Sequence, residues 1–81
     1  IATSGMTLVT GNKYPYWKGD LLVGSLKNSY LERLTIRNNK VMAREKIADG
    51  IGRVRDVIMG PSGYIHIAVE FEGIYRLIPK N

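Results

Sequence analysis

The sequence predicts an all-β fold for this 81-residue chain. Seven short segments rich in β-branched and other apolar residues are separated by turn signals containing Gly, Pro or Asn, the pattern of antiparallel strands and hairpins. Residues 29–37 could be forced into a helix, but Thr35 and Ile36 directly before Asn38 and Asn39 favour a strand. The expected strands cover residues 5–9, 20–26, 30–37, 41–48, 53–59, 64–71 and 74–78.

The first two strands enclose a long loop. The strand at 5–9 ends at a Thr-Gly-Asn turn signal, and the strand at 20–26 has the apolar centre Leu-Leu-Val. Between them, residues 12–19 carry the run Tyr-Pro-Tyr-Trp. This loop therefore holds most of the large aromatic side chains of the first half.

The third and fourth strands form a hairpin. The strand at 30–37 alternates, with Leu34 and Ile36 on one face and polar residues on the other, as in a half-buried strand. The turn is expected at 38–40, because Asn tolerates the positive φ that tight hairpin turns require. The strand at 41–48 then pairs back along its predecessor.

The pattern restarts after a glycine-rich connection at 49–52. The strand at 53–59 is closed by Gly-Pro-Ser-Gly at 60–63, which places Pro and Gly in good turn positions. The strand at 64–71 alternates strictly, and a last strand at 74–78 is ended by Pro. The apolar positions expected to share one face are Ile65, Ile67, Val69 and Phe71.

Two architectures fit this order of strands. Four linked strands fill the first 48 residues and three fill the rest, and a repeat of roughly 40–50 residues with four antiparallel strands is the period of a β-propeller blade. Two blades cannot close a ring, since propellers have at least about four. Pattern alone therefore favours a free-standing seven-stranded barrel or sandwich over a piece of a propeller.

Composition excludes several classes of protein. The chain has no cysteine, so disulfides and thiolate metal sites are ruled out, and its single histidine, His66, argues against a zinc cage. No apolar run approaches the ~20 residues of a membrane-spanning helix. The chain starts at Ile1 with no initiator Met or signal-peptide pattern, so we expect a chain that has been processed or cut.

Four motifs in a fixed order cover nearly the whole chain. They are Ser-Gly-Met at 4–6, Lys-Gly-Asp-Leu-Leu-Val-Gly-Ser-Leu-Lys at 18–27, Gly-Arg-Val-Arg-Asp-Val at 52–57 and Gly-Pro-Ser-Gly-Tyr-Ile at 60–65. In this order they resemble the C-terminal end of the soluble quinoprotein glucose/sorbosone dehydrogenases, a family that includes aldose sugar dehydrogenases. The resemblance implies part of a six-bladed β-propeller, with 1–48 as one blade and 49–81 as three strands of the last.

The same resemblance implies a function and assigns residues to it. The family binds pyrroloquinoline quinone and calcium at the top of the central channel and oxidises aldoses to lactones. Lys27 matches the family lysine that contacts the cofactor, and Arg53 and Arg55 match the arginine pair of the family's Arg-x-Arg-Asp motif. The family's catalytic histidine and calcium ligands lie in earlier blades, and His66 does not match that histidine. No catalytic or metal-binding residue is therefore expected here, and the chain alone is expected to be inactive.

Propeller geometry is consistent with these assignments. The loop between the second and third strands of a blade opens at the same end as the connection to the next blade, so Lys27 and Arg53 would reach one rim of the channel. Arg53 and Arg55 share a strand face while Val54 turns away. Arginine forks bind carboxylates bidentately and lysine adds a point charge, which suits a trianionic quinone. The aromatic loop at 14–17 would lie at the far end, and we interpret it as packing.

A second class of function stays open. A stand-alone basic β-domain could bind nucleic acid or another polyanion, since the net charge is +5 and the pI is about 9.8. The basic residues are spread along the chain, however, and the aromatic residues gather in one loop rather than along a basic strand face. The favoured prediction therefore has no nucleic-acid partner and no membrane span.

Partners and location follow from the resemblance and from the strand edges. The expected partners are an aldose and either the remaining propeller blades or another copy of the chain, which would pair with exposed strand edges. The family resemblance implies a periplasmic or secreted protein. The family often carries a Thr-Asp pair near the top face, where this chain has Val-Glu-Phe-Glu-Gly at 69–73. The resemblance therefore does not fix which sugar is preferred.

Overall fold

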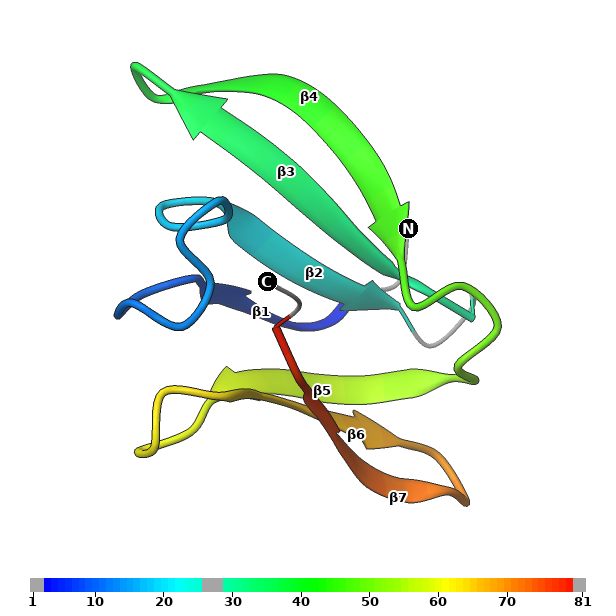
Figure 1. The fold of residues 1–81 in the computed structure, drawn as a ribbon. Helices are drawn as coiled ribbons and strands as arrows, with labels where there is room; N and C mark the ends of the chain where they lie inside the picture. Colours follow the sequence, from blue (N-terminus) through cyan, green and yellow to red (C-terminus); the bar gives the residue numbers. More distant parts are fainter. Residues whose placement is uncertain (1–2, 26–28, 80–81) are drawn as a thin grey trace.

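The computed structural model describes residues 3–25 and 29–79, which form two antiparallel sheets (Figure 1). The first sheet has the order β1-β2-β3-β4 and the second the order β5-β6-β7. No helix long and apolar enough to cross a membrane occurs in the part of the chain that is described. The strands are β1 (Thr3–Leu8), β2 (Leu21–Ser25), β3 (Leu31–Arg37), β4 (Lys40–Ile47), β5 (Val54–Met59), β6 (Ile65–Val69) and β7 (Gly73–Leu77).

Each strand expected from the sequence is present, and most bounds differ by only one or two residues. The turn between β3 and β4 is the one that the sequence predicts: Asn38 and Asn39 have φ of 52° and 63°. Two positive φ values in succession at the centre of a two-residue hairpin define a primed turn, whose twist matches that of the flanking strands.

The end of β6 is a correction to the sequence prediction. Alternation predicts a strand that runs to Phe71, with this residue on the same face as Ile65, Ile67 and Val69, but β6 ends at Val69. Phe71 has a φ of 65° and its side chain is 96% exposed. A left-handed residue cannot continue a strand, so the chain turns here and the ring leaves the core.

The hydrophobic core lies between the two sheets. In Figure 1 the first sheet lies above the second, with β1 next to β5, and both β1 and β2 pack against β5. Because side chains alternate across a sheet, β6 contributes every second residue to this layer, namely Ile65, Ile67 and Val69. The buried residues of the core are Val9, Tyr14, Leu22, Leu31, Val54, Val57, Ile65, Ile67 and Val69.

A glycine permits close approach of the two sheets. A Cβ atom on Gly24 of β2 would lie 2.5 Å from Cγ1 of Val54 and 3.1 Å from Cγ2 of Val57, both on β5. These separations are shorter than van der Waals contact, so any larger residue at position 24 must push the sheets apart. The close spacing between the sheets thus depends on the absence of a side chain at Gly24.

Tyr14 joins the long loop after β1 to the second sheet. Its hydroxyl group donates a hydrogen bond to the backbone oxygen of Leu77 at 2.5 Å and accepts one from the backbone N–H of Ile65 at 2.9 Å. The side chain is only 5% exposed, and its ring stacks on that of Trp17 with centroids 5.8 Å apart. The interpretation of this loop as packing is confirmed for both rings, whereas Tyr16 is 90% exposed.

Three connections between strands lie at the same end of the sheets. Gly50, in the β4–β5 connection, donates its N–H to the oxygen of Ser29, in the β2–β3 connection, at 2.7 Å. Glu70, in the β6–β7 turn, donates its N–H to the oxygen of Arg53 at 2.8 Å. We call this end of the molecule the rim. The aromatic loop is at the opposite end, where Lys13 places its ammonium group 4.5 Å from the ring centroid of Tyr64, next to the β5–β6 turn.

Gly24→Ala should destabilise the protein by about 1–3 kcal/mol, because the new methyl group overlaps Val54. In urea unfolding, the double variant Gly24→Ala/Val54→Ala should lose less free energy than the sum of the two single variants, since Val54→Ala removes the atom in the way. Strictly additive losses would contradict this description of the interface.

Tyr14→Phe should lower the unfolding free energy of the protein and also change how that free energy depends on pH. Burial raises the pKa of Tyr14 above its usual value of about 10, although the hydrogen bond from Ile65 opposes the shift. A raised pKa favours the protonated phenol in the folded state, so its contribution is complete below pH ~10 and is lost as pH rises through the raised pKa.

Urea unfolding between pH 8 and pH 11 measures both effects. At pH 8, Tyr14→Phe should lose about 1–3 kcal/mol of unfolding free energy, because two backbone groups lose their hydrogen-bond partner. Above pH ~10, the unfolding free energy of the variant should fall less steeply with pH than that of the unsubstituted protein. Tyr16→Phe, at an exposed ring, is the matched control and should change neither quantity. Equal slopes in the Tyr14→Phe and unsubstituted proteins would refute the role assigned to the buried phenol.

Candidate functional site

The arginine pair at the start of β5 points away from the core. Val54 lies between the two arginines and is fully buried, so its neighbours face the other way. The pairing of β5 with β6 is irregular at this point: Val54 is opposite Val69, and Asp56 is opposite Ala68. Arg55 is therefore the extra residue of a β-bulge, a feature that redirects side chains at sheet ends and sites.

Both arginines converge on one carboxylate. Arg55 Nη1 donates to Glu70 Oε2 at 2.8 Å, and Arg53 Nε lies 3.6 Å from Glu70 Oε1. The Glu70 side chain is 19% exposed, while those of the arginines are about 60% exposed. The pair thus already holds one carboxylate at the rim and presents much of its guanidinium surface to a ligand. This arrangement fits a cofactor that carries carboxylates.

Glu70 is the member of this cluster that sequence reasoning missed. Plain counting outward from the turn at 60–63 places residue 70 opposite residue 54. The β-bulge at Arg55 shifts the pairing by one residue and brings Glu70 beside Arg53, and no pattern in the sequence marks that bulge. From the sequence, residues 69–73 are expected only to differ from the Thr-Asp connection of the family. The structure makes Glu70 the acidic partner of both predicted cofactor-binding arginines.

Lys27, the third predicted cofactor-binding residue, lies outside the described residues. Its neighbours on both sides are described, and they place the β2–β3 connection at the rim: β2 ends at Ser25, and Ser29 accepts a hydrogen bond from Gly50. The structure therefore brings Arg53 and Arg55 together with Glu70 and leaves Lys27 as a prediction. Across residues 3–25 and 29–79, no three His, Cys, Asp or Glu side chains gather in a group that could hold a metal ion.

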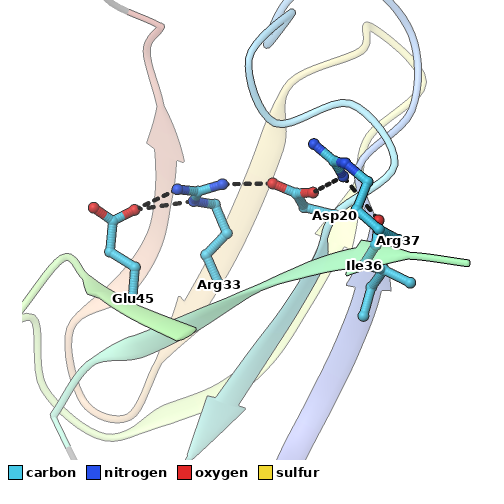
Figure 2. A network of polar contacts seen from close by, with 5 residues as sticks. All are labelled: Asp20, Arg33, Ile36, Arg37 and Glu45. Atoms are coloured by element: carbon cyan, nitrogen blue, oxygen red, sulfur yellow. Dashed lines mark hydrogen bonds and ion pairs between the residues drawn. The ribbon is translucent and has the colours of Figure 1, made fainter. Parts of the chain in front are cut away.

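A second charged network lies at the opposite end of β2 (Figure 2). Asp20 is 1% exposed, and its Oδ2 accepts a hydrogen bond of 2.5 Å from Arg33 Nη1. Arg33 also donates to Glu45 Oε1 through Nε at 3.0 Å and Nη2 at 2.8 Å. Arg37 Nη1 lies 3.7 Å from Asp20 Oδ1 and donates to the oxygen of Ile36. The buried carboxylate is thus compensated by two arginines.

The electrostatics of this network mark it as structural. Partial burial would lower the pKa of Arg33, but its hydrogen bonds to Glu45 and Asp20 outweigh that effect and raise the pKa. The guanidinium group also lies over the ring of Trp17, 5.4 Å from its centroid. The network joins β2, β3 and β4 to the aromatic loop, away from the rim. We therefore assign it to holding the first sheet and not to ligand binding.

An apolar groove of about 310 Å³ lies beside the same loop. It is lined by three aromatic side chains and a proline of the loop, together with the last residue of β7 and the two residues that follow it. Its position is opposite the rim, so it is separate from the arginine pair. Its lining residues are Tyr14, Pro15, Tyr16, Trp17, Leu77, Ile78 and Pro79.

Comparison with known proteins identifies relatives of this chain. Residues 1–76 match a protein-family model described as Glucose / Sorbosone dehydrogenase. A protein of Escherichia coli strain K12, named aldose sugar dehydrogenase YliI, is 30% identical over 83 residues that cover 99% of this chain. A Synechocystis protein, named uncharacterized protein slr1608, is 34% identical over 71 residues that cover 86% of it.

Solved structures give the same result for the fold. A structure entitled "glucose dehydrogenase" superimposes with a TM-score of 0.88 at 30% identity over 99% of this chain, and a second with a TM-score of 0.81 at 31% identity. The predicted fold, an all-β piece of a β-propeller, is thereby confirmed, and the free-standing barrel or sandwich that pattern alone favoured is wrong. The chain spans 22% of the E. coli relative and 24% of each solved chain.

Arg33→Ala should cost about 3 kcal/mol of unfolding free energy, because it leaves the Asp20 carboxylate buried without its closest partner. Arg44→Ala is the matched control. Arg44 comes from the neighbouring strand and pairs with Glu32 at 2.9 Å, but its side chain is 61% exposed, so its loss should cost less than about 1 kcal/mol. If both variants lost the same unfolding free energy in urea, the buried ion network would contribute no more to stability than an exposed ion pair.

Proposed function

Since this chain belongs to the glucose/sorbosone dehydrogenase family, we propose that it forms the C-terminal part of a quinoprotein that oxidises aldoses to lactones. The observation that carries the proposal is the convergence of Arg53 and Arg55 on one carboxylate at the rim. The bound cofactor, pyrroloquinoline quinone, would supply the two-electron chemistry by accepting the two electrons and two protons that leave C1 and its hydroxyl group.

The residues of this chain would bind and orient the cofactor. Arg53 and Arg55 would donate N–H groups to its carboxylates, as they do to Glu70, and Lys27 would add a third positive charge from the neighbouring blade. Two guanidinium groups beside the quinone also favour the negative charge that develops as the sugar is oxidised. Together they contribute fixed positive charge that needs no reorganisation during the reaction.

The remaining parts of the site would come from elsewhere in the protein. The proton-accepting histidine and the calcium ligands of the family are expected in earlier blades, so the chain alone should not oxidise sugar. In the complete protein, this segment then acts as one wall of a shared cofactor site. We extend the proposal to a periplasmic or secreted location, which rests on family resemblance alone.

Exposed apolar side chains on the outer sheet faces support an association with further blades or another copy. On the first sheet, Met6 and Leu8 are 58% and 52% exposed. On the second, Ile58 and Ile74 are 51% and 73% exposed. Apolar sheet faces of this kind are normally covered by a packed layer, as the inner faces of these two sheets cover each other.

Arg55→Ala in the complete dehydrogenase should weaken binding of pyrroloquinoline quinone by about 10- to 100-fold, the loss expected for a charge-assisted hydrogen bond. Arg55→Lys should retain part of the affinity, because it keeps the charge but loses the fork. The affinity is measured by titrating the cofactor-free protein with the quinone and following sugar-dependent dye reduction.

Arg44→Ala is the control for this experiment. Arg44 is as exposed as Arg55 but lies on β4, the outer strand of the first sheet, so its removal changes net charge equally without touching the rim. Unchanged quinone affinity in Arg55→Ala, or an equal loss in Arg44→Ala, would contradict the proposed role of the arginine pair.

A further inference from the structure

The turn between β6 and β7 carries an aromatic ring in an unfavourable place. Phe71 is 96% exposed, more than any other large apolar side chain among the described residues. Its φ of 65° is a left-handed conformation, which a bulky residue adopts only against a steric cost. Gly or Asn would avoid that cost, as Asn38 and Asn39 do in the β3–β4 turn. Both packing and backbone preference therefore argue against Phe here.

The turn that holds Phe71 is anchored on both sides. Glu70 is fixed by its hydrogen bond to the Arg53 backbone and by the two arginine side chains. Glu72 donates its N–H to the oxygen of Val69 at 3.1 Å and accepts a hydrogen bond of 3.5 Å from the Tyr75 hydroxyl. The ring between them is thus held out from a fixed turn, next to the predicted cofactor-binding pair.

The two sheets present matching loops at the rim. The β6–β7 turn joins the second and third strands of its sheet, as the connection after Ser25 does in the first sheet. That connection carries Lys27, the predicted cofactor contact. The β6–β7 turn, and Phe71 with it, therefore lies at the same end of the molecule as Ser25 and the arginine pair.

We propose that Phe71 is a sugar-contacting residue that sets the affinity for the aldose substrate. The inference rests on the proposed function of the rim. The C–H groups on one face of a pyranose ring form an apolar surface, and an aromatic ring beside the quinone site would cover it. The contacts between the two sheets come chiefly from inward-facing strand residues. Phe71 is on a turn and belongs to neither sheet face, so its position suits a ligand better than another blade.

Substitutions in the complete enzyme separate stability from substrate binding. Phe71→Gly should raise the urea midpoint, because glycine relieves the left-handed backbone. The same variant should raise KM for the aldose about five- to tenfold, the value of one aromatic contact, with kcat little changed. Phe71→Tyr keeps the ring and should retain the original KM. Tyr16→Ala, at an equally exposed ring opposite the rim, should alter neither KM nor kcat.

Each other outcome has a definite meaning. An active Phe71→Gly enzyme with unchanged KM overturns the proposal for Phe71 and leaves the proposed function intact. A lower urea midpoint in Phe71→Gly, restored in Phe71→Tyr, shows that the ring packs against another part of the protein and also overturns it. An unsubstituted protein that binds the quinone but oxidises no aldose overturns both the function and this inference.

Discussion

The buried hydroxyl group of Tyr14 is the contact on which the relation between the two sheets depends. It joins the backbone of β6 and β7 to the loop that follows β1, and it does so inside the apolar layer, where an unpaired backbone group would be costly. Trp17 stacks on its ring, and the guanidinium group of Arg33 lies over the ring of Trp17. The Asp20 network then continues to Arg33 on β3 and Glu45 on β4 (Figure 2). One phenol thus connects the polar network of one sheet to the strands of the other.

The two ends of the molecule therefore differ in how their charged side chains are placed. At the end with the aromatic loop, charge is buried and compensated, and rings are stacked. At the rim, Arg53 and Arg55 are largely exposed and share a single carboxylate. A ligand that approaches the rim meets cations whose positions are set by a strand and a bulge, and the strand is held by the core through Val54. Rigid support beneath exposed charge is the condition that a preorganised anion site requires.

Much of this fold was predictable because local signals agreed. Alternation and turn residues located every strand, and Asn38-Asn39 specified a turn by its backbone preference. Two features were not accessible in this way. Tyr14 makes its hydrogen bonds to residues 51 and 63 positions further along the chain, a separation on which no local pattern reports. Phe71 continues an alternating strand in the sequence, and only its anchored neighbours force the chain to turn. The arginine pair was found through family resemblance, and its partner Glu70 by geometry.

The residue that departs most from the usual preferences for backbone conformation and burial lies close to the cluster of charged side chains. Phe71 contradicts backbone preference and burial, and it adjoins a carboxylate that gathers two arginines. A sequence selected for stability alone would place Gly or Asn in this turn and an apolar residue in the core. The proposed ligands, the quinone and its aldose substrate, would account for both the strained, exposed ring and the converging charge beside it. On the proposed function, the rim would bind its ligands at a cost in stability, which the phenol and the buried ion network at the other end would offset.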